Sequence, residues 1–175
     1  MVDPETKAIQ RLINAFEATT LPRDQWTHTA HLTVALWYLT KYALPTAVQQ
    51  IREGIQRYNT AVGIRLTPNS GYHETITLFW IQVICCYVTA QGITGFTPDV
   101  ITQLMERYGD PQLPFRYYSR DRLLSWDARI NWIEPDLQAL APNNTQTTPI
   151  MKQPSGQSST VPQSGSHASP EQHDR

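Results

Sequence analysis

Two short strings gather three of the five histidines of this 175-residue chain. The first is WTHTAHL, residues 26–32, with His28 and His31. The second is GYHETIT, residues 71–77, with His73 and Glu74. Imidazole nitrogens and carboxylates are the usual protein ligands of zinc and non-haem iron, and they are also the usual acid–base groups of enzymes. The two strings are therefore the first place to look for a functional site.

Helical geometry predicts that these side chains lie close together. At about 100° per residue, His28 and His31 share a face with the apolar residues that follow them, and His73 shares a face with Ile76 in the same way. Short connections make neighbouring helices antiparallel, so two helices separated by a third begin at the same end of a bundle. We therefore expect His28, His31, His73 and Glu74 to converge, with the three imidazoles pointing inward.

Such a cluster would suit a metal-dependent enzyme. His28, His31 and His73 are candidate ligands of one divalent transition metal, zinc or iron, with an open coordination position. Glu74 and His73 are the candidate catalytic residues of a small hydrolase or oxygenase that acts on a small molecule. We expect Glu74 to accept a hydrogen bond from an imidazole of the preceding histidine string, which would fix its tautomer.

Two other roles for the cluster are left open. A metal-free pocket could use the Glu74–His73 pair on a small-molecule ligand. Alternatively, the cluster is a structural hydrogen-bond network in a non-enzymatic helical module that binds a ligand or a partner. Candidate substrate-binding residues are Thr77, one turn into the same helix, and Arg120 and Arg122, which could clamp an anion over the site.

The elements that position these residues are all predicted to be helices. Apolar residues recur with the helical period, and Pro, Gly, Ser and Thr mark the ends. We expect five main helices, followed by short helical pieces that Ser119 and Ser125 cap and that Trp126 and Trp132 pin to the bundle. The fourth helix is expected to be central because it is apolar almost all round. The five expected ranges are 4–18, 25–42, 45–62, 70–91 and 98–108.

Composition and charge predict the domain organisation, the excluded partners and the location of the protein. Residues 1–140 form the predicted helical domain, whereas residues 141–175 are rich in Pro, Ser, Thr and Gln and are predicted to be disordered. A net charge of −1 gives no basic footprint for nucleic acid. We expect no membrane span and no signal peptide, and hence a cytoplasmic protein. The two cysteines, Cys85 and Cys86, are adjacent and build no disulfide framework.

The strings WTHTAHLTVALWYL and GYHETITLFW together resemble an uncharacterised family of small helical bacterial proteins. Its members carry an aromatic-x-His-x-x-His-Leu string and a Tyr-His-Glu-Thr-x-Thr string. The resemblance spans roughly residues 16–80. It implies the helical fold and directs attention to the two strings, but it implies no reaction.

Overall fold

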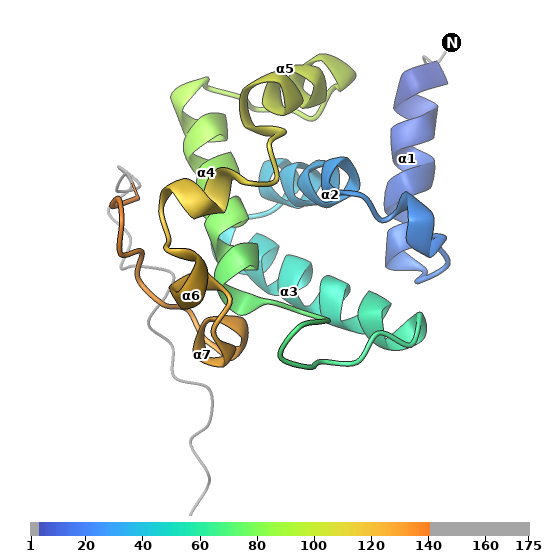
Figure 1. The fold of residues 1–175 in the computed structure, drawn as a ribbon. Helices are drawn as coiled ribbons and strands as arrows, with labels where there is room; N and C mark the ends of the chain where they lie inside the picture. Colours follow the sequence, from blue (N-terminus) through green and yellow to red (C-terminus); the bar gives the residue numbers. More distant parts are fainter. Residues whose placement is uncertain (1–3, 141–175) are drawn as a thin grey trace, which may run out of the picture.

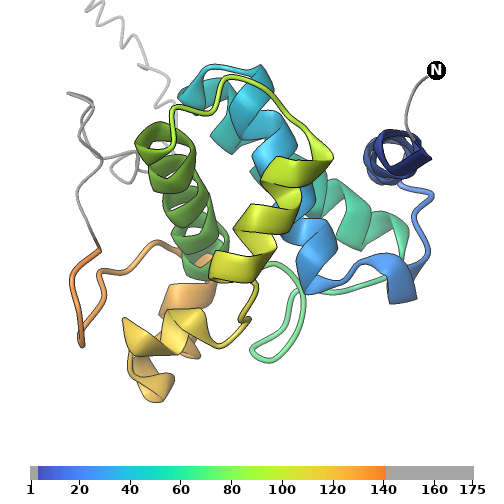
Figure 2. The same cartoon turned by 90° about the horizontal axis from the view of Figure 1, so that it is seen from above.

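The computed structural model describes residues 4–140, and these form an all-helical fold. Five longer helices carry most of it. Figures 1 and 2 show how they are arranged. The 3-10 helix η1 (Arg23–Gln25) lies between the first two of them, and the 3-10 helix η2 (Leu113–Arg116) follows the fifth. The longer helices are α1 (Pro4–Glu17), α2 (His28–Lys41), α3 (Leu44–Ala61), α4 (Glu74–Ala90) and α5 (Pro98–Tyr108). The all-helical prediction is thus confirmed, while the predicted tail at 141–175 lies outside the described residues.

Helix α2, and not α4, is the centre of the fold. It packs against all of the other longer helices, α1, α3, α4 and α5. Helix α4 packs against α2 and α3 and carries α7 (Trp126–Ile130) on its other side. An apolar surface was therefore a poor guide to which helix is central, because α4 also buries itself under the C-terminal cover, α6 (Arg120–Leu123) and α7.

The helix starts follow from capping chemistry. Thr27 caps α2 by accepting a hydrogen bond from the Ala30 N–H, at 3.2 Å, and Thr97 caps α5 in the same way. Ser125 caps α7 as predicted. The expected start of the second helix near Asp24 was wrong, because residues 23–25 form the separate 3-10 turn η1 and the chain then extends to Thr27.

The C-terminal cover is attached by polar contacts and by apolar packing, in which Trp132 packs against the core as expected, with its ring 6.3 Å from that of Tyr118. Trp126 is 46% exposed, so the expectation that it pins the cover was wrong. The Thr75 hydroxyl donates to the Asn131 carbonyl, at 2.7 Å, and accepts from the Ile133 N–H. Arg129, which is only 7% exposed, reaches from α7 to the loop before α4. Among the described residues, no helix is both long and apolar enough to span a membrane.

Candidate functional site

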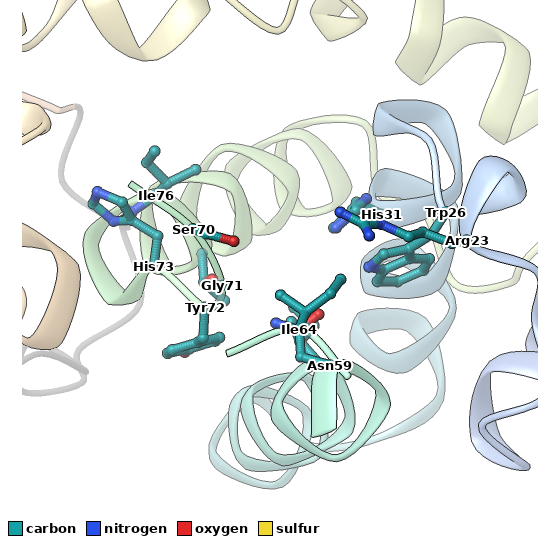
Figure 3. Close-up of a pocket in the computed structure, with 12 residues that line it drawn as sticks. Arg23, Trp26, His31, Asn59, Ile64, Ser70, Gly71, Tyr72, His73 and Ile76 are labelled. Carbon is teal, nitrogen blue, oxygen red and sulfur yellow. The ribbon is translucent and has the colours of Figure 1, made fainter. Parts of the chain in front are cut away.

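A pocket of about 320 Å³ lies where α2 and α4 begin, and the end of α3 closes it from below (Figure 3). Each of the two strings contributes a histidine to its lining, His31 from the first and His73 from the second, whereas His28 and Glu74 do not line it. Its size is at the lower end for small-molecule sites. The twelve lining residues are Arg23, Trp26, His31, Ile55, Asn59, Ile64, Ser70, Gly71, Tyr72, His73, Ile76 and Thr77.

His31 is held in one orientation and one tautomer. Its ring lies against Trp26, with centroids 3.8 Å apart, and Trp26 in turn stacks on Phe16 at 4.7 Å. The Nδ1 atom is 2.7 Å from the carbonyl of Thr27, and a carbonyl only accepts, so Nδ1 carries the proton. Nε2 is then the acceptor of the ring. Burial lowers the pKa of His31 to about 4, an effect opposed by the Thr27 carbonyl and reinforced by nearby His28. At neutral pH the pocket therefore contains a neutral, oriented imidazole.

His73 has a structural role. It is the N-cap of α4, where its Nδ1 accepts a hydrogen bond from the Ile76 N–H at 3.3 Å. Its Nε2 must then carry the proton, which it donates to the Leu123 carbonyl of α6 at 3.0 Å. Burial, together with the charge of Arg129, lowers the pKa of His73 to about 4. Both ring nitrogens are used within the protein, so neither is available to a metal ion.

His28 is separated from the pocket. Its ring packs against Trp80 of α4, with centroids 4.7 Å apart, which confirms that it points inward. Burial lowers its pKa, while the backbone of Tyr108 and the charge of Asp110 oppose that shift. Its Nε2 is buried without a hydrogen-bond partner among the described residues. The three histidines thus face three different surroundings.

Glu74 does not contact the histidine string, so the expected hydrogen bond from an imidazole to this carboxylate was wrong. Glu74 is buried at 7% exposure and binds the Arg52 guanidinium of α3 through both oxygens, at 2.7 and 3.2 Å. The Tyr72 hydroxyl donates to the same carboxylate at 2.6 Å. Its hydrogen-bonding capacity is therefore directed at α3 and not at the pocket.

The structure gives the predicted three-histidine metal centre no support. Within residues 4–140, no group of three or more His, Cys, Asp or Glu side chains is placed to hold a metal ion. The physical reason lies in the partners described above: His73 caps a helix, Glu74 binds an arginine, and His28 packs on an indole.

Only one of the three predicted substrate-binding residues lies at the pocket. Thr77 lines the pocket, as expected. Arg120 and Arg122 do not: Arg120 lies over the Phe115 ring, 5.4 Å from its centroid, and Arg122 donates to the Glu134 carbonyl at 2.8 Å. Both side chains are exposed on the C-terminal cover.

The wall opposite His31 is a loop whose shape requires glycine and a buried arginine (Figure 3). Gly71 has φ +87°, and a Cβ there would lie 2.8 Å from the Arg65 carbonyl oxygen. Arg129 donates to the carbonyls of Pro68, Gly71 and Tyr72, at 3.0 to 3.3 Å, and so holds the loop against α7. Sequence reasoning missed both Arg129 and the pocket residue Asn59, since neither belongs to a motif.

Asn59 adds an amide to the pocket. It is 9% exposed, and its side chain makes no hydrogen bond to another described residue. Its backbone carbonyl accepts from the Ile64 N–H at 2.8 Å, which turns the chain out of α3. Because Asn59 lines the pocket, water or a ligand can bind this amide.

Neither a family model, nor a curated protein, nor a solved structure matches the chain. The resemblance to the helical bacterial family stays a prediction. What the protein does must therefore be inferred from the pocket itself.

Proposed function

We propose that this protein binds a small polar molecule in the pocket between α2, α3 and α4, and that it is a ligand-binding module. The single observation that carries the proposal is His31. Its Nδ1–H is fixed on the Thr27 carbonyl, so its ring is an oriented hydrogen-bond acceptor on a pocket wall.

Two features of the pocket favour binding over catalysis. The pKa of His31, about 4, makes the imidazole a weak base at neutral pH, whereas an efficient general base has a pKa near the working pH. The other groups with acid–base chemistry, His73 and Glu74, are already saturated by protein partners. An uncharged imidazole is well suited to recognise a donor group of a ligand.

Asn59 and Thr77 supply the other polar contacts. An amide both donates and accepts, and a hydroxyl does the same, so the pocket can recognise a molecule with donors as well as acceptors. Trp26, Ile55, Ile64 and Ile76 supply apolar surface around them. A few polar groups set in an apolar wall is the usual composition of a small-molecule site.

The proposal is tested by fragment binding to the full chain. A set of small polar fragments, charged and neutral, is added to ¹⁵N-labelled protein, and the backbone amide of Gly71 and the side-chain amide of Asn59 are followed by NMR. We expect some fragments to shift both signals together.

The variant His31→Phe keeps the ring against Trp26 but removes the acceptor. We expect it to weaken those fragments at least tenfold, while Thr29→Ala, an exposed change on the same helix turn, leaves them unaffected. Unaltered binding to His31→Phe, or no fragment that shifts the two signals, would overturn the proposal.

A further inference from the structure

The charge around the pocket is one-sided. Among the twelve lining residues Arg23 is a permanent cation, and there is no aspartate or glutamate. Within the described residues Arg23 forms no ion pair, and the neighbouring Asp24 does not line the pocket. Glu74, which follows the lining residue His73, is neutralised by Arg52.

A second positive charge lies directly behind the wall. The Arg129 guanidinium is 7% exposed and donates to three backbone carbonyls, but it meets no carboxylate within the described residues. Carbonyl dipoles solvate this cation without cancelling its charge. The same guanidinium contributes to the lowered pKa of the lining residue His73.

The neutral polar groups of the pocket set a second requirement for a ligand, a matching hydrogen-bond donor. His31 offers an acceptor at Nε2, and the Asn59 amide offers one donor group and one acceptor. A ligand that satisfied only the positive charge would leave the imidazole acceptor desolvated and unpaired, which weakens binding.

We infer that the pocket takes a small organic anion, a carboxylate or a phosphate monoester, that also carries a hydrogen-bond donor such as a hydroxyl. The anionic group pairs with Arg23, which lies on the same side of the pocket as His31 (Figure 3), and the donor group binds Nε2 of His31. Arg129 adds positive charge behind the opposite wall. The inference rests on the proposed function and deepens it, since it names the class of ligand. A pocket of about 320 Å³ is within the size range of small-molecule sites.

The test compares matched probes on the full chain. The probes are 4-hydroxybenzoate, its neutral amide 4-hydroxybenzamide, and phenyl phosphate, each titrated by NMR with the Gly71 and Asn59 signals as the readout. We expect 4-hydroxybenzoate or phenyl phosphate to bind at least tenfold more tightly than the amide. The anion that binds more tightly identifies the carboxylate or the phosphate source.

Two arginine variants test which positive charge binds the anion. We expect Arg23→Gln to remove most of the preference for the anion, whereas Arg120→Gln, on the exposed C-terminal cover, leaves it unchanged. Asn59→Asp would place a like charge in the pocket and weaken the anions further.

The outcomes separate the two ideas. If the amide binds as well as the anions and Arg23→Gln has no effect, the inference about charge is wrong while a ligand-binding pocket remains. If the loss follows Arg120→Gln instead, the anion site is on the cover and the inference is wrong. If none of the three probes shifts the pocket signals, and none of the polar fragments does, both ideas fail together.

Discussion

Acid should destabilise this fold through its buried histidines before the carboxylates titrate. His31 and His73 each have a pKa of about 4 in the folded protein and an ordinary value of 6.5 when unfolded. As the pH falls below 6.5, these two histidines therefore become protonated in the unfolded chain while they stay neutral in the folded chain. The stability is fully present above 6.5 and is lost as the pH falls towards 4.

The size of the loss follows from the two values. Between pH 7.5 and pH 5 each histidine costs about 2 kcal/mol of the free energy of unfolding, and the limit well below pH 4 is about 3.4 kcal/mol. His31 and His73 together then account for about 4 kcal/mol over that interval, a large part of the usual 5–15 kcal/mol of a domain. The lowered pKa of His28 acts in the same direction.

The assay is urea unfolding of the full chain, followed by far-ultraviolet circular dichroism at several pH values. The variant His73→Asn keeps a side chain that can cap α4, and we expect it to reduce the loss between pH 7.5 and pH 5 by about 2 kcal/mol. We compare how steeply the free energy of unfolding changes with pH in the variant and in the wild type, since the variant is also less stable at every pH. His31→Phe serves as the second variant, and Thr29→Ala as the control with the wild-type slope.

An unchanged pH slope in both variants would refute the reasoning, because it would mean that neither imidazole is buried in its neutral form. A protein that gained stability on acidification would refute it more strongly. Either result would also remove the basis for His31 as a neutral acceptor in the pocket.

Three further outcomes are expected from the same structure. Glu74→Gln should cost about 2 kcal/mol in urea unfolding, since it removes the charge that the Arg52 guanidinium binds, and it should leave the metal content of the purified protein, measured by elemental analysis, unchanged. Gly71→Ala should lower the melting temperature more than Gly63→Ala, because both have positive φ but only at Gly71 would a Cβ approach a backbone atom within 3 Å. Arg129→Lys should cost about 1–3 kcal/mol and shift the NMR signals of the loop 65–72, since one ammonium cannot replace a guanidinium that binds three carbonyls.

The fold was largely predictable because its local signals are strong. Proline at the first turn and a threonine cap fix the start of α5, and glycine follows α3 and α4. The starts of α2 and α4 were placed three to four residues too early, however. Asp24 and Ser70 are both good capping types, but the first lies inside a 3-10 turn and the second closes a turn with Thr67. Capping preference alone does not distinguish a helix start from a turn.

The misplaced start of α4 explains why the predicted grouping of side chains was wrong. His73 was placed inside a helix, where the helical period fixes the direction of a side chain. It is instead the N-cap, with φ −139° and ψ 105°, so its ring turns back over the first turn of α4. The starts of α2 and α4 lie at the same end of the fold as predicted, because this depends only on topology. The predicted contacts between particular side chains depend on each dihedral angle, and among the described residues they are absent.

The second string is explained by packing alone. His73, Glu74 and Thr75 are consecutive, and on a helix start consecutive side chains diverge by about 100°. Each therefore meets a different element: His73 binds α6, Glu74 binds α3, and Thr75 binds the segment after α7. Three neighbouring polar residues thus anchor one end of α4 in three directions, which requires these residue types without any chemistry. The first string has no such saturation, because His31 ends in an acceptor on the wall of a pocket. Function is for that reason to be sought at His31, and Thr77, in the second string, lines the same pocket.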